Sequence, residues 1–223
     1  MGLLNGEWNR SCLVGNELKG KTLGIVGLGR IGREVIKRSI GMEMKILGCD
    51  PFVNQDMFDP ETVTIVEIDK LTKDSDYITL HLPLLETTEN LFDLERFSIM
   101  KSTARIINVS RGGIVNESDL AKALNGDIIS GAAIDVFKSE PLDPNNPLLN
   151  AKNILLTPHL GASTYEASEG VSFGICRQIK EFLLEEKLAN PINMPITDMA
   201  QLKQIKPFLD LAKDIIDFLR IRK

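Results

Sequence analysis

A run of six residues, Gly27-Leu28-Gly29-Arg30-Ile31-Gly32, has the spacing G-x-G-x-x-G between an apolar run and a helical pattern. In this spacing the first glycine permits a tight turn, the second lets the backbone approach a pyrophosphate, and the third lets helix and strand pack closely. The start of the following helix would offer N–H groups to the phosphates. Asp50 lies 18 residues after Gly32 (50 − 32), close to the spacing of a carboxylate that binds ribose hydroxyls. These residues predict a site for NAD.

Ionisable side chains with unusual neighbours occur in three further segments, residues 108–113, 135–141 and 157–164. Arg111 precedes two glycines, Glu140 precedes a proline, and His159 follows a proline. A guanidinium grips a carboxylate with two parallel hydrogen bonds, and an imidazole exchanges protons near neutral pH. Each segment follows a predicted strand, and open α/β sheets bind ligands at the carboxyl ends of their strands. We therefore expect these side chains to lie at the same edge as the cofactor.

The elements that must position these residues alternate along the chain. Short apolar, β-branched runs predict strands over residues 22–27, 44–49, 62–66, 77–82, 105–109, 130–136 and 153–157. Helical spacing of apolar residues predicts helices over residues 30–40, 68–73, 91–100, 117–124, 164–186 and 201–219. Strands that alternate with helices predict an α/β fold of the Rossmann type, a doubly wound parallel sheet covered on both faces and followed by C-terminal helices.

The composition excludes several classes of protein. The 223 residues carry a net charge of −5, which argues against a nucleic-acid or anionic-membrane partner held by bulk electrostatics. No apolar run approaches the roughly 18 residues that would span a bilayer. Three scattered cysteines (Cys12, Cys49 and Cys176) and two histidines do not have the spacing of a zinc site. We expect no metal, and reduced thiols in a cytoplasmic protein.

The glycine turn and the three segments, in this order, resemble the signatures of the D-isomer-specific 2-hydroxyacid dehydrogenase family over residues 18–164. Residues 190–195 and the helix after them resemble the longer members of that family. The resemblance implies an oxidoreductase that transfers a hydride between NAD and a small-molecule D-2-hydroxy acid. The implied reaction is the conversion of 3-phosphoglycerate to 3-phosphohydroxypyruvate in serine biosynthesis.

The resemblance also implies a role for each catalytic residue. Arg111 would bind the substrate carboxylate and carbonyl, and His159 would take the C2 hydroxyl proton. Glu140 would hydrogen-bond the imidazole and fix its tautomer, and Asp135 would face the nicotinamide carboxamide. His81 is expected to have a structural role. The implied cofactor-binding residues are Gly27, Gly29, Arg30, Ile31, Gly32, Asp50, Leu82, Val109, Ser110, Arg111, Asp135, His159, Leu160, Gly161 and Ala162.

The front of the chain departs from the family pattern, because intact members place a substrate lobe before the inter-domain helix that residues 6–10 resemble. We interpret residues 1–17 as a remnant of that helix and residues 18–163 as the NAD-binding domain. Residues 164–189 would be a helix that returns toward the substrate lobe, and residues 190–223 a connector and helix toward a further domain. Such a fragment should bind NAD and turn substrate over poorly alone.

Three functions remain open from the sequence. The first is the dehydrogenase above, as a homodimer or a higher homo-oligomer. The second is a related enzyme, such as a glyoxylate/hydroxypyruvate reductase or a D-lactate dehydrogenase. The third is a non-catalytic NAD-binding sensor or corepressor-like module, against which the complete set of Arg111, Glu140 and His159 argues.

Overall fold

The computed structural model describes residues 5, 6, 8, 10, 14–185, 187, 189, 190 and 199–220. Most of the predicted remnant at residues 1–17, and residues 191–198 of the predicted connector, lie outside the described residues. The chain forms two compact units, Met1–Gly161 and Ala162–Lys223.

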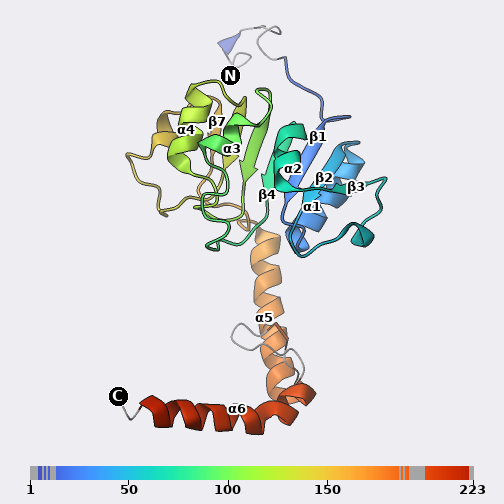
Figure 1. The fold of residues 1–223 in the computed structure, drawn as a ribbon, viewed down its shortest axis with the longest axis vertical. Coiled ribbons are helices and arrows are strands. Elements are labelled where there is room, and N and C mark those ends of the chain that lie inside the picture. Colours follow the sequence, from blue (N-terminus) through green and yellow to red (C-terminus); the bar gives the residue numbers. More distant parts are fainter. Residues whose placement is uncertain are drawn as a thin grey trace. The chain divides into compact units, whose positions relative to one another are not determined.

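The first unit is built on seven parallel strands, as predicted for a doubly wound sheet (Figure 1). Their order across the sheet is β3-β2-β1-β4-β5-β6-β7. The chain therefore builds outward from β1 on one side, and then returns to β4 on the other side of β1. The strands are β1 (Thr22–Val26), β2 (Lys45–Cys49), β3 (Val63–Ile65), β4 (Tyr77–Leu80), β5 (Arg105–Asn108), β6 (Gly131–Ile134) and β7 (Ile154–Leu156).

Helices join the strands near the predicted positions. They are α1 (Arg30–Gly41), α2 (Ile68–Asp74), α3 (Leu94–Ser98), α4 (Glu117–Asn125) and the 3-10 turns η3 (Gln55–Met57) and η4 (Pro147–Asn150). The helix predicted over residues 91–100 is shorter than expected. Phe92 instead pairs with Val115 in an isolated parallel bridge, and the Asp93 side chain caps the helix by accepting the Arg96 N–H. Because Phe92 is paired in an extended bridge and Asp93 is the N-cap, α3 begins only at Leu94.

Two clusters of buried side chains hold the sheet. The smaller cluster contains Leu23 and Ile25 of β1 with Ile36 of α1. The larger contains Ile78 of β4, Leu71 of α2 and Phe97 of α3, together with residues of α4 and of the strands beyond. Each fully buried side chain of this size contributes roughly 1.5–3 kcal/mol to the free energy of folding. The two clusters pack the helices against the sheet.

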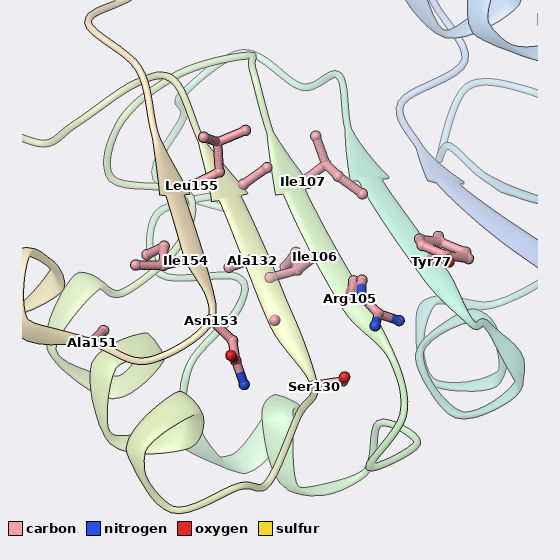
Figure 2. A pocket seen from close by; sticks show the side chains of 12 residues that line it. Tyr77, Arg105, Ile106, Ile107, Ser130, Ala132, Ala151, Asn153, Ile154 and Leu155 are labelled. Atoms are coloured by element: carbon pink, nitrogen blue, oxygen red, sulfur yellow. The ribbon is translucent and has the colours of Figure 1, made fainter. Parts of the chain in front are cut away.

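The predicted cover on both faces is incomplete within this unit. Across β4 to β7, the face that carries Tyr77, Ile107 and Leu155 is an open recess of about 650 Å³, and Leu155 is 63% exposed (Figure 2). The face is left open because of the order in which the chain adds its strands to the sheet. From β3 onward every connection moves the same way across the sheet, and right-handed crossovers then place α2, α3, α4 and η4 on one face.

The second unit contains two helices, α5 (Tyr165–Glu185) and α6 (Met199–Arg220), at the predicted positions. Thr164 precedes α5, and its hydroxyl accepts the Ala167 N–H, as an N-cap does. Apolar side chains of α5 such as Val171, Ile175 and Leu183 are exposed. Among the residues that the structure describes, no helix has the length and apolarity needed to cross a membrane.

Candidate active site

The glycine turn after β1 has the geometry that its sequence requires. Gly27 has a φ of +94°, and a side chain there would collide with the carbonyl oxygen of His81. A side chain at Gly32 would collide with the carbonyl oxygen of Gly27. Around Gly29, in contrast, no atom lies within 4 Å of where a side chain would begin. The turn is therefore closed against the sheet at Gly27 and Gly32 and open at Gly29.

The first turn of α1 is suited to an anion. Gly29 is its N-cap, no side chain caps the helix, and its first turn carries no acidic residue. The N–H groups and the positive end of the helix dipole are thus left for a ligand. A pyrophosphate at Gly29 would meet both, so these residues fit the phosphates of NAD.

Asp50 lies directly beside this turn. Its Oδ2 atom accepts the Leu28 N–H at 2.8 Å and its Oδ1 atom accepts the Phe52 N–H at 2.9 Å. Each carboxylate oxygen has a second lone pair, so both can also accept ribose hydroxyls. Residues 51–53 are Pro-Phe-Val and provide no cation for a 2′-phosphate.

His159 and Glu140 form a hydrogen-bonded pair. The Nδ1 atom of His159 lies 2.8 Å from Oε2 of Glu140. Because a carboxylate only accepts, the donor is Nδ1–H, and Nε2 is the ring nitrogen left to exchange a proton. The hydrogen bonds from His159 and from the Phe137 N–H, the latter at 2.9 Å, hold the pKa of Glu140 below its usual range. The imidazole is half exposed, so a ligand can reach it.

Asp135 holds the segment that carries His159. Its carboxylate accepts the Thr157 hydroxyl at 2.6 Å and the N–H groups of Leu160 and Gly161 at 2.7 and 3.0 Å. Burial opposes its charge, but these hydrogen bonds outweigh burial and hold the pKa of Asp135 below its usual range. The sequence prediction gave Asp135 only a contact with the nicotinamide. Its part in shaping this segment was missed, because donors about 25 residues away leave no local pattern.

The backbone of His159 is itself unusual, with a φ of +55°. Left-handed backbone is uncommon for a residue with a side chain, and it persists only where the surroundings enforce it. Here the backbone N–H of His159 donates to the carbonyl oxygen of Asp135 at 2.9 Å. The Asp135 carboxylate accepts the backbone N–H groups of the next two residues. The strained turn is what carries the imidazole past the end of β7.

Arg111 is presented by a loop that Asn108 organises. The buried Asn108 amide donates to the Arg111 carbonyl oxygen at 3.0 Å and accepts the Ser110 N–H and hydroxyl. The Arg111 guanidinium is exposed and donates to the Ser110 carbonyl oxygen at 2.7 Å. A side chain at Gly112 would collide with the backbone of Phe137, so the Arg111 loop lies against the loop that carries Glu140.

Further predicted residues of the first unit lie along the same carboxyl edge, among them the exposed Arg30 at the start of α1. Ile31, Val109 and Leu160 are exposed apolar side chains after β1, β5 and β7. Leu82 lies against Gly27, and Ala162 belongs to the second unit. An apolar recess of about 490 Å³ beside His159, lined in part by Leu142 and Leu149, was not foreseen from the sequence.

His81 follows β4, and the structure supplies two structural contacts for it. Its Nε2 atom lies 3.0 Å from the Thr79 hydroxyl, and its backbone N–H donates to the Val26 carbonyl oxygen at 2.7 Å. Burial lowers the pKa of His81. Its side chain contacts its own strand, which agrees with the structural role expected from the sequence.

The site combines a glycine turn after β1 that is open to an anion and a carboxylate after β2 with the pair formed by Glu140 after β6 and His159 after β7. On a parallel sheet, these features define the class of dinucleotide-binding proteins. The family model described as D-isomer specific 2-hydroxyacid dehydrogenase, NAD binding domain, matches residues 2–161. The chain belongs to the D-isomer-specific 2-hydroxyacid dehydrogenase family and contains its NAD-binding domain.

Known relatives agree with this assignment. The D-3-phosphoglycerate dehydrogenase of Methanocaldococcus jannaschii is 42% identical over 95% of this chain and 40% of its own length. That of Synechocystis sp. is 42% identical over 94% of this chain and 38% of its own length. A crystal structure of an NAD-dependent formate dehydrogenase from Staphylococcus aureus, in complex with NAD, matches with a TM-score of 0.74 and 33% identity, over 84% of this chain and 56% of that one. The chain thus spans about two fifths of the length of these curated relatives.

Proposed function

We propose that this chain binds NAD and supplies the catalytic residues for oxidising the C2 hydroxyl of 3-phosphoglycerate to 3-phosphohydroxypyruvate, in serine biosynthesis. The observation that carries the proposal is the hydrogen bond of 2.8 Å between His159 and Glu140 at the edge that also holds the glycine turn. The choice of substrate is supported by the names of the two relatives above.

The residues that would hold NAD are those of the glycine turn, the first turn of α1, and Asp50. The turn and helix would bind the pyrophosphate, and Asp50 the ribose hydroxyls. The exposed apolar side chains of Ile31, Val109 and Leu160 would contact the rings. When bound, NAD supplies the carbon that accepts the hydride.

Proton transfer would then rest on the chain's own side chains. Arg111 binds the substrate carboxylate and so orients the C2 hydroxyl. Nε2 of His159 takes the hydroxyl proton as the hydride leaves C2, and Glu140 stabilises the imidazolium that forms. The proton then passes to solvent, which restores the neutral ring.

The proposal is tested by following NADH formation from 3-phosphoglycerate. The chain is assayed alone and in a chimera with the N-terminal region of the Methanocaldococcus jannaschii relative, with glyoxylate, hydroxypyruvate and D-lactate compared in either direction. We expect the chimera to prefer 3-phosphoglycerate. Preference for another acid would replace the substrate. Tight NAD binding with no turnover by the chimera on any acid would favour a non-catalytic NAD-binding module.

We also propose, from the family resemblance, that the protein is cytoplasmic and forms a homodimer or a higher homo-oligomer. Analytical sedimentation at high micromolar concentration tests the assembly, and a single monomeric species would contradict it. Fractionation of cells that express the tagged protein tests the compartment.

A further inference from the structure

We infer that Glu117 is a positioning residue, which holds the loop that presents Glu140 to His159. The inference rests on the proposed function, in which His159 exchanges the proton. Oε1 of Glu117 accepts the backbone N–H of Lys138 at 2.7 Å. Oε2 accepts the side-chain amide of Asn146 at 2.6 Å. One carboxylate thus fastens the loop near both of its ends.

The loop in question runs from the end of β6 to the start of η4, over residues 135–146. Glu140 lies inside it, and the Phe137 N–H donates to Oε1 of Glu140 at 2.9 Å. Phe137 and Lys138 are consecutive, so the backbone that Glu117 holds is the backbone that holds Glu140. A shift of residues 137–138 would therefore carry the Glu140 carboxylate away from the imidazole.

The Phe137 side chain is buried in the larger cluster, but an apolar side chain cannot accept the backbone N–H that Glu117 accepts. The other polar and backbone contacts of this loop do not replace Glu117 either. Lys138 Nζ lies 3.3 Å from Glu89, but both side chains are largely exposed, and such pairs add little. Gly112 lies against the backbone of residues 137–138, but it only blocks movement in one direction. Glu117 supplies the directed hydrogen bonds that fix the position.

Asn146 has one orientation that satisfies its surroundings. It is buried, and its Oδ1 atom accepts the Leu148 N–H at 3.0 Å as the N-cap of η4. Its amide nitrogen must then face Glu117, which acts as the acceptor. If the Asn146 amide were rotated by half a turn, its NH₂ group would face the backbone N–H of Leu148, and two donors would meet. The donor–acceptor order between Glu117 and Asn146 is therefore fixed.

Glu117 is not needed to cap its own helix. Asn116 is the N-cap of α4, and its side chain accepts the Asp119 N–H at 3.0 Å. An acid in a first helical turn also stabilises the helix through the dipole. The experiment must separate this stabilisation of the helix from the effect of the hydrogen bonds between Glu117 and the loop.

The test uses a swap of the two partners. Glu117→Gln sets its new amide donor against either the Asn146 amide or the Lys138 backbone N–H, and Asn146→Asp sets two carboxylates together. In Glu117→Gln/Asn146→Asp the order of donor and acceptor is reversed and the hydrogen bond returns. Glu95→Gln is the matched control, because Glu95 is an exposed acid in the first turn of α3.

The readout is the ¹⁵N spectrum of the His159 ring in the chain without substrate or NAD. The chain has only two histidines, and His81 serves as an internal reference for the fold. We expect a single Nδ1–H tautomer in the parent, in the control and in the double variant. Each single variant should show mixed tautomers, together with at least about a tenfold loss of kcat in the active chimera, because displacement by about 1 Å can cost roughly 10²-fold.

An unchanged His159 spectrum in both single variants would overturn the inference, as would a folded double variant that does not recover the single tautomer. Where a single variant does not fold, the double variant alone decides. The proposed function fails on a different result, namely full activity of His159→Ala in the chimera. The two outcomes are therefore separate.

Discussion

The carboxylate of Asp135 accepts the backbone N–H of Leu160 at 2.7 Å, which ties the end of β6 to the segment that follows β7. The imidazole of His159 is placed by this contact and its neighbours as much as by Glu140. The position of the imidazole, the proposed proton-transfer group, therefore depends on a buried acid that need not touch the substrate.

Replacing Asp135 with Asn should destabilise the first unit by about 1–3 kcal/mol, because one amide oxygen cannot accept all three donors and the new NH₂ group faces another donor. Urea unfolding measures this change. Asp127→Asn is the control. Asp127 is exposed, its φ of +55° suits Asn, and the change there should stay within about 0.5 kcal/mol. Equal losses in the two variants would contradict the role given to Asp135.

Acid should weaken the fold in two stages. The pKa values of His81, Asp135 and Asp76 are all lowered in the folded state. The unfolded chain then binds more protons, so stability falls as pH falls. The loss should begin near pH ~6.5 with His81 and steepen below pH ~4 with the aspartates, since those are the unfolded pKa values.

Unfolding midpoints in urea between pH 7 and 3 measure this profile. The Asp135→Asn variant should lose part of the lower stage and keep the upper one. A midpoint that rises on acidification would mean that the signs of these shifts are wrong.

NAD should bind at least about tenfold more tightly than NADP, a difference of about 1.4 kcal/mol. Asp50 lies at the glycine turn through its hydrogen bond to Leu28, and its charge would repel a 2′-phosphate. Calorimetric titration with both cofactors measures the ratio. Equal affinities would place Asp50 away from the ribose.

His159→Ala should lower kcat of the active chimera by about 10²–10⁴ and leave NADH affinity nearly unchanged. Glu140→Gln should act in the same direction, because a neutral amide stabilises the imidazolium less than a carboxylate does. Steady-state rates and calorimetry on the same preparations separate the two effects. A loss of NADH affinity that matches the loss of rate would show that His159 serves binding instead.

The sheet and the glycine turn could be predicted because their causes are local. The apolar and β-branched run at residues 22–26 favours a strand by its own composition, and a φ of +94° with a close carbonyl requires glycine at position 27. The shortened α3 could not be predicted, since Phe92 pairs with Val115 across 23 residues (115 − 92). Periodicity carries no information about such a bridge.

The candidate site also has a part that could be predicted from the sequence and a part that depends on contacts between distant residues. Arg111, Glu140 and His159 could be proposed from their unusual neighbours in the sequence. The acids that hold the segments of His159 and Glu140, Asp135 and Glu117, act through hydrogen bonds to donors 21 to 29 residues away. Only the folded arrangement shows which donors these are.

The order of the strands also affects how cofactor choice and chemistry can evolve in such a protein. The residues that would choose the cofactor follow β1 and β2, those that would do the chemistry follow β5, β6 and β7, and β4 lies between the two groups. Substitutions in groups with no shared partner tend to add independently. A lineage could therefore exchange one cofactor for another near Asp50 while the inherited chemistry at His159 is left intact.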